Sequence, residues 1–140
     1  MTALTIKMRP VGAEAVLTRF GHPQVQSDTG GALDVVTAAS EPGFNPLDLL
    51  FSSLAACLVL SARIAASRLG LIGQFAEARA HVTGEKSSEE PFRIKRLFID
   101  LTVEGDLDQT QKMQISRMAE EICTVSNTLR SPPELVVTSH

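Results

Sequence analysis

An uninterrupted apolar helix limits what this chain can fold into more than any other feature of its sequence. Residues 46–69 read PLDLLFSSLAACLVLSARIAASRL and contain no residue that would break a helix. Asn45 can cap the start, where Pro46 suits the first helical position and Asp48 can act as the acid of a capping box. Gly70 is a suitable stop. The predicted helix is about 36 Å long, roughly the width of a small domain.

This helix is apolar on nearly all of its sides, so it must be covered from all directions. A chain of 140 residues has too little remaining structure to wrap a helix of this length by itself. We therefore expect a second subunit to cover part of it, and the predicted assembly is a homodimer.

Period-two patterns in front of the helix predict short strands. In residues 4–8 the apolar side chains of Leu4, Ile6 and Met8 alternate with polar ones. Residues 12–20 and 32–37 predict further strands, and turns rich in Gly and Pro separate them. A β-meander is the natural interpretation.

Behind the helix the alternation returns. Residues 76–83 and 97–103 alternate in the same way, and the polar stretch between them predicts a long hairpin. A second helix is expected from a cap at Asp108 to about Cys123, and a last strand over residues 133–138. Strands, a long helix, a long hairpin, a helix and a strand together predict a single α+β domain over residues 1–140.

Composition excludes several classes of function. The formal net charge is −3, and the chain has neither Trp nor Tyr, so it lacks the basic face and stacking aromatics that nucleic acids require. Asp48, Ser52 and Ser53 interrupt the longest apolar stretch, which argues against a membrane span. The N-terminal residues do not resemble a signal peptide. We expect a cytoplasmic protein, in which the cysteines are free thiols or a transient redox pair.

Cys57 lies in the middle of the predicted helix, and only a thiolate can act as a nucleophile. The helix dipole is too distant to help, and Arg63 and Arg68 are poorly placed on the helix. An unassisted thiol there should have a pKa at or above its ordinary value, so activation requires a cation from another segment. Ser53 and Ser61 flank Cys57 one helical turn away on either side. A pocket for an apolar substrate and close packing of a structural cysteine both fit this pattern.

Other sites have less support. The two cysteines and the scattered His22, His81 and His140 show no metal-ligand spacing, so no metal is expected. His81 lies on the polar face of a predicted strand and should be solvated rather than paired with a cysteine. Asp48 lies on the opposite side of the helix from Cys57, which makes capping its expected role.

Two segments carry a family resemblance. The run NPLDLLFSSLAACLVLSARIAASRLGL, followed by EEICTVSNTLRSPPELVV, resembles the OsmC/Ohr family of organic hydroperoxide reductases and osmotically induced relatives. Members have an Asn/Ser-Pro-x-Glu/Asp-Leu-Leu start, a cysteine further along that helix, and a second cysteine in a Cys-Pro-Val-Ser-Asn-Thr-like segment. The likeness extends to the meander and the hairpin, and so covers essentially the whole chain.

The resemblance implies an intertwined homodimer with long helices packed centrally. It implies that Cys57 is the peroxidatic cysteine, that Cys123 is the resolving one, and that Arg19 is the arginine that contacts the reactive thiol. The substrate would be an organic hydroperoxide and the reductant an external dithiol, lipoyl-type or thioredoxin. No cofactor is implied.

Two positions depart from the family pattern. Leu47 stands where the reductases usually have a glutamate that pairs with the arginine, and Thr124 stands where the second motif has a proline. The chain is thus more similar to the broad OsmC-like branch. We expect a thiol peroxidase in oxidative stress defence; the alternative, which Leu47 favours, is a small-molecule binding protein or redox sensor with little turnover.

Overall fold

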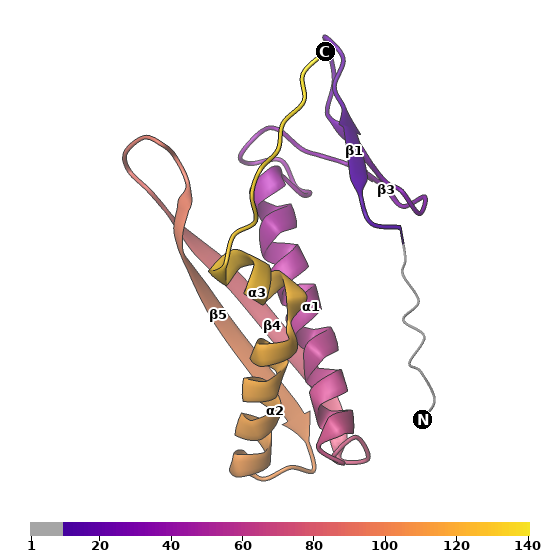
Figure 1. Cartoon of the computed structure of the whole chain (residues 1–140), viewed down its shortest axis with the longest axis vertical. Coiled ribbons are helices and arrows are strands. Elements are labelled where there is room, and N and C mark those ends of the chain that lie inside the picture. The colour runs from indigo at the N-terminus through magenta and orange to yellow at the C-terminus, as the bar shows by residue number, and fades with distance from the viewer. Residues whose placement is uncertain (1–9) are drawn as a thin grey trace. The chain divides into compact units, whose positions relative to one another are not determined.

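The computed structural model describes residues 10–140, which divide into two compact units, one up to Leu49 and one from Leu50 to His140. The chain contains five strands and three helices in this described part (Figure 1). Mixed helices and antiparallel sheets confirm the predicted α+β class. The single domain over residues 1–140 stays a prediction.

The N-terminal unit is a three-stranded antiparallel meander in the order β1-β2-β3. β1 spans Ala13–Val16, β2 Gln24–Ser27 and β3 Ala32–Asp34. β1 and β3 confirm the strands expected within residues 12–20 and 32–37. The sequence did not predict β2, because its QVQS is short and mostly polar. The strand expected over residues 4–8 lies outside the described residues.

The long helix α1 spans Pro46–Arg68 and confirms the helix predicted over residues 46–69. A reciprocal capping box fixes its start. The Asp48 backbone N–H donates to Asn45 Oδ1 at 2.8 Å, and the Asn45 backbone N–H donates to Asp48 Oδ2 at 3.0 Å. The expected capping role of Asp48 is therefore confirmed.

In the second unit, α1 and α2 cover one face of a long hairpin (Figure 1). β4 (Phe75–Lys86) pairs antiparallel with β5 (Ile94–Gly105), as predicted, and Ala80 lies opposite Leu101. α2 spans Gln109–Ile122 and begins with the predicted cap at Asp108. These elements form a fully buried core of small and medium side chains: Ala62, Ala65, Ala66, Val103, Ile115 and Ala119.

A second apolar cluster lies further toward the start of α1 and holds Leu54, Leu58, Val82 and Cys123. Here the helix approaches the sheet closely: a Cβ at Gly84 of β4 would lie 2.9 Å from the Phe51 ring. The small residue lets the start of α1 pack against the hairpin, which positions the following turns of the helix.

The opposite side of α1 is not covered in the single chain. Leu60 is 51% exposed and Ile64 is 47% exposed. By length and composition alone α1 could cross a membrane, a test that the core helix of a globular domain also passes. Its buried side packs against β5 and α2, as expected of a core helix.

The C-terminal part differs from the sequence prediction in two ways. A third helix, α3 (Thr124–Arg130), follows α2 directly and was not predicted. The strand expected over residues 133–138 is wrong for the single chain, because this segment is extended but pairs with no other strand. Leu135, Val136 and Val137 are each at least 80% exposed. A β-strand needs a neighbouring strand for its backbone hydrogen bonds, and sequence alternation alone does not supply one.

Candidate active site

The structure brings the two cysteines together, although 66 positions separate them in the sequence. Cys57 projects from the middle of α1 and is half-buried, whereas Cys123 is fully buried. Both are free thiols, and their side chains hydrogen-bond to each other. The pair lies within the second apolar cluster, beside Leu54 and Leu58 of α1.

The junction of α2 and α3 positions Cys123. This residue ends α2 and caps α3, with an extended backbone at φ −69° and ψ 109°. Its sulfur accepts a hydrogen bond from the backbone N–H of Ser126 at 3.4 Å, in the role that a Ser or Asp side chain usually has at a helix start. Because a new helix begins here, the first N–H groups of α3 have no partner within the helix.

Those N–H groups reach the Cys57 sulfur. Burial by itself raises the pKa of the Cys57 thiol, but hydrogen bonds to the sulfur outweigh it and leave the pKa below its ordinary value. The donors, in decreasing order of effect, are the Val125 N–H, the Cys123 thiol, the Ser61 hydroxyl and the Thr124 N–H. Each of them favours the thiolate, the form in which cysteine is a nucleophile.

The pKa of the Cys123 thiol shifts in the opposite direction, above its ordinary value. Burial is the main cause that raises the pKa of its thiol, and the neighbouring Cys57 raises it further, against the lowering effect of the Ser126 N–H. Within the pair, Cys57 therefore gives up its proton first and Cys123 keeps its own. A thiolate and a thiol in contact are the starting arrangement for nucleophilic attack followed by disulfide formation.

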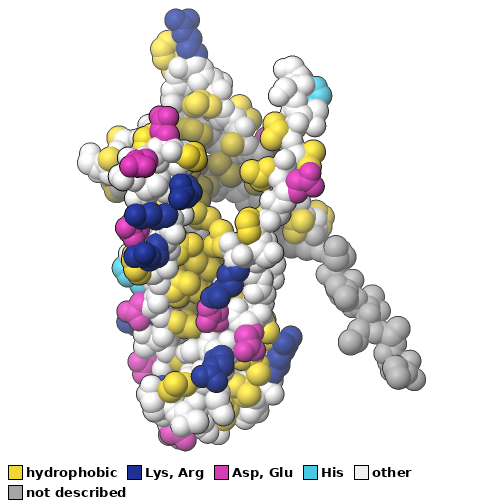
Figure 2. All heavy atoms as spheres, turned by 60° about the vertical axis from the view of Figure 1, so that its left-hand side comes forward, with side chains coloured by type: hydrophobic (Ala, Val, Ile, Leu, Met, Phe, Trp, Pro, Cys, Tyr) yellow, Lys and Arg dark blue, Asp and Glu magenta, His cyan; other side chains and the backbone are white. Residues whose placement is uncertain are grey.

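A groove lined by leucine and isoleucine side chains, and also by Asp100, Arg117 and Glu120, runs along the second unit between β5 and the two C-terminal helices. Two adjoining hollows of about 480 Å³ and 210 Å³ share Ile99 and reach down to Leu54 and Leu58. Ile99, which lines both hollows, is 40% exposed. Figure 2 shows hydrophobic side chains gathered in a hollow on this side of the molecule, with charged side chains along its margins. The cysteine pair itself lies in the neighbouring apolar cluster, so its immediate surroundings are suited to apolar rather than strongly polar compounds.

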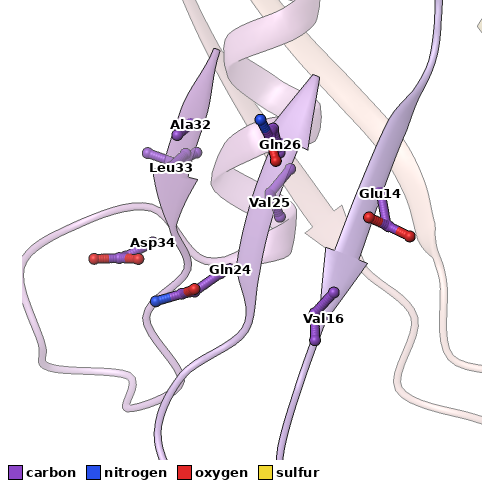
Figure 3. Close-up of a pocket in the computed structure, with 8 residues that line it drawn as sticks. All are labelled: Glu14, Val16, Gln24, Val25, Gln26, Ala32, Leu33 and Asp34. Atoms are coloured by element: carbon purple, nitrogen blue, oxygen red, sulfur yellow. The ribbon is translucent and has the colours of Figure 1, made fainter. Parts of the chain in front are cut away.

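A separate hollow of about 280 Å³ lies on the N-terminal sheet (Figure 3). Cross-strand neighbours line it, including Glu14 opposite Gln26 and Gln24 opposite Asp34. It contains two carboxylates, two amides and short apolar side chains, but neither a thiol nor a cation. Its lining therefore offers no thiol and no cation to assist one, and the cysteine pair is the better candidate site.

Arg19 lies in the N-terminal unit, in the exposed segment after β1. Its guanidinium carbon is 5.4 Å from the centre of the Phe20 ring, a cation–π distance. The partnership of Arg19 with Cys57 stays a prediction.

The other residues weighed from the sequence have separate places. Ser53, which flanks Cys57 on the N-terminal side, donates its hydroxyl hydrogen to the Leu50 carbonyl at 2.7 Å. His81 is exposed on β4 opposite Asp100, in agreement with the expected solvated position. Among residues 10–140, no group of three potential ligand side chains could hold a metal ion.

The sequence argument considered cations only and overlooked the backbone donors of α3, which lower the pKa of the Cys57 thiol. A contribution from the Arg19 guanidinium stays a prediction. The available signal for the backbone donors was Thr124. A proline at this position, as in the family motif, has no N–H, whereas Thr124 has one and directs it at Cys57. The absence of that proline could therefore have indicated an additional donor near the pair.

Comparisons with known proteins agree with this architecture. The family model described as OsmC-like protein matches residues 38–138. An uncharacterized protein of Haloferax volcanii is 25% identical over 103 residues, which cover 74% of this chain and 76% of that protein.

Solved structures are also similar. The OsmC-like protein of Mycoplasma pneumoniae matches with a TM-score of 0.74 at 21% identity and covers 89% of each chain. The organic hydroperoxide resistance protein OhrB of Bacillus subtilis matches with a TM-score of 0.65 at 24% identity, over 89% of this chain and 93% of that one. At these identities the likeness shows a shared fold.

Proposed function

Because this chain belongs to the OsmC-like protein family, we propose that it is a thiol-dependent peroxidase that reduces organic hydroperoxides in oxidative stress defence. The observation that carries the proposal is the contact between a thiol of lowered pKa, Cys57, and a thiol of raised pKa, Cys123. Family relatives named organic hydroperoxide resistance proteins support the substrate class.

The proposed reaction has three steps. The Cys57 thiolate attacks the terminal, hydrogen-bearing oxygen of the hydroperoxide, and the O–O bond breaks to give a Cys57 sulfenic acid and an alkoxide that leaves as the alcohol after taking up a proton. The Cys123 thiol then displaces hydroxide from the sulfenic sulfur, so that a disulfide forms and one water is released. An external dithiol, lipoyl-type or thioredoxin, reduces this disulfide and is itself oxidised. One hydroperoxide is thus reduced for each dithiol oxidised, with no cofactor.

The proposal is tested on the reduced protein with one equivalent of cumene hydroperoxide. We expect release of cumyl alcohol in equal amount and a peptide linked through Cys57 and Cys123 in the mass spectrum. A matched sample with hydrogen peroxide should react more slowly, because the cluster that surrounds the pair is apolar. Unchanged hydroperoxide and two free thiols after the incubation would overturn the proposal.

We assign to Arg19 the stabilisation of the leaving oxygen. A guanidinium can donate two hydrogen bonds and carries the charge that a developing alkoxide requires. Arg19→Ala should slow the reaction of Cys57 with hydroperoxide at least about tenfold, which corresponds to about 1.4 kcal/mol. Stopped-flow measurement of thiolate absorbance follows the rate, and Arg63→Ala serves as a control on an exposed arginine of α1. If Arg19→Ala and Arg63→Ala react at the same rate, a group other than Arg19 stabilises the leaving oxygen.

The assembly proposed is a homodimer located in the cytoplasm. Within the described residues, twelve hydrophobic residues are buried whereas seventeen large hydrophobic residues are exposed, among them Leu60 and Ile64 on α1. An apolar helix face of this kind is covered in a stable protein, and a second copy would cover it. Sedimentation should show a dimer at micromolar concentration, and a stable monomer there would contradict this assignment.

A second candidate function, a binding protein or redox sensor with little turnover, rests on the start of α1. Leu47 replaces the glutamate that pairs with the arginine in the reductases, and Asp48 cannot substitute because it accepts the Asn45 N–H. Such a protein would form the Cys57–Cys123 disulfide once per molecule but would not consume further hydroperoxide when a dithiol is present. Counting the equivalents consumed separates the two functions.

A further inference from the structure

The two buried polar side chains of the described residues both lie beside the cysteine pair. Ser61 and Ser126 are each only 4% exposed, and every other buried residue in this part is hydrophobic. Ser126 contacts Cys123 through its backbone N–H and accepts a hydrogen bond from Arg130 Nε on its hydroxyl, at 3.4 Å. Ser61 has no charged partner of this kind, and its hydroxyl faces Cys57. A buried hydroxyl beside the proposed nucleophile needs a reason.

Burial and hydrogen bonding, rather than spacing, distinguish Ser61 from Ser53. Residues four apart on a helix lie one above the other, and every side chain leans toward the N-terminal end of its helix. Ser61 therefore leans back toward Cys57, as Cys57 leans toward Ser53. Ser53, however, is exposed, and its hydroxyl donates to the Leu50 carbonyl at 2.7 Å, whereas Ser61 is buried and hydrogen-bonds to Cys57. Two serines at equal sequence distance thus have different surroundings.

We propose that Ser61 is a positioning residue for Cys57, whose hydroxyl holds the Cys57 sulfur in the orientation from which it attacks a hydroperoxide. Three observations support it: the one-turn spacing on α1, the near-complete burial of Ser61 and the half-burial of Cys57. The proposal rests on the proposed peroxidase function. Ser61 itself exchanges no proton with the substrate; it acts only through the sulfur.

The position of the sulfur matters because Cys57 has two partners in the proposed reaction. Its sulfur has to meet a hydroperoxide while it stays beside the buried Cys123, with which it then forms the disulfide. A hydrogen bond from the same helix can hold the sulfur in that place. The donors on α3 lie on the Cys123 side, so Ser61 supplies the restraint that is independent of α3.

The test compares Ser61→Ala with Ser53→Ala, a matched control with the same change one turn away. In a Cys123→Ser background, Cys57 is the one remaining thiol, and its alkylation by iodoacetamide is measured from pH 5 to pH 10. We expect Ser61→Ala to move the alkylation profile to higher pH and to slow alkylation below the midpoint about three- to tenfold. Ser53→Ala should leave the profile unchanged, and Ser61→Thr, which retains a hydroxyl, should restore most of the rate.

With the Cys123 thiol present, the same variants are assayed with cumene hydroperoxide. Ser61→Ala should lower the rate of the first attack by a similar factor, whereas thermal unfolding should stay close to that of the unmodified protein. An alkylation profile that does not move in Ser61→Ala would overturn the proposal, since the hydroxyl would then bond to the helix backbone instead. If the alkylation profile shifts but the protein consumes no hydroperoxide, the contact between Ser61 and Cys57 is supported and the proposed peroxidase function is rejected.

Discussion

Cys57→Ser should abolish hydroperoxide consumption, with a loss of at least about 1,000-fold. Serine has the same shape, but its hydroxyl stays protonated at neutral pH and is a poor nucleophile toward an O–O bond. Cys123 remains in this variant, yet burial and its neighbour raise the pKa of its thiol, so it should not take over the attack. Consumption of cumene hydroperoxide with excess dithiol measures the effect.

The control for this variant is Ser53→Ala, which alters an exposed residue of the same helix and should leave the rate unchanged. Thermal unfolding of the Cys57→Ser protein checks that the fold is retained, because the substitution removes little volume from the cluster. A residual rate within tenfold of the unmodified protein would mean that Cys57 is a packed structural cysteine.

Cys123→Ser should separate the first attack from the rest of the cycle. One equivalent of hydroperoxide is still consumed, because the nucleophile and its α3 donors remain. The sulfenic acid at Cys57 then lacks its thiol partner, and dimedone should trap it in high yield. With excess hydroperoxide, Cys57 should advance to the sulfinic acid, and turnover should fall at least about tenfold.

Mass spectrometry distinguishes these products, and the unmodified protein treated alike gives the linked peptide instead. If Cys123→Ser still turned over at the full rate, the external dithiol would reduce the sulfenic acid directly. Cys123 would then have no resolving role, and its contact with Cys57 would matter only for the pKa of that thiol.

The sequence predicted those elements whose signal lies within one segment. The helix over 46–69 has its cap, its first-turn proline and its stop in the chain itself, and the hairpin strands have a clear alternation. The strand over 133–138 failed because its existence depends on a neighbouring strand. β2 was missed because its side chains are half-exposed and do not need an apolar pattern.

The candidate site was predictable in its residues but not in its electrostatics. The family resemblance nominated Cys57 and Cys123, and the structure places them in contact. The cause of the lowered pKa of Cys57 is a set of backbone groups in α3, a seven-residue helix. Every residue except proline has a backbone N–H, so these donors cannot be recognised from residue type. A search for charged side chains therefore could not find them. The missing proline at Thr124 marked only one of them, the Thr124 N–H, which has the smallest effect of the donors.

The backbone donors of α3 also bear on how easily the oxidised pair can be reduced. Thr124 and Val125 donate to the Cys57 sulfur, and Ser126 donates to that of Cys123. These hydrogen bonds favour the thiolate and are weaker toward a neutral disulfide, so they stabilise the reduced form of the pair. A stabilised reduced form raises the reduction potential of a disulfide, by about 30 mV for each 1.4 kcal/mol in a two-electron couple. In the proposed peroxidase, the arrangement that lowers the pKa of Cys57 would thus also make the Cys57–Cys123 disulfide a better oxidant, which a dithiol of moderate reducing strength can return to the reduced state.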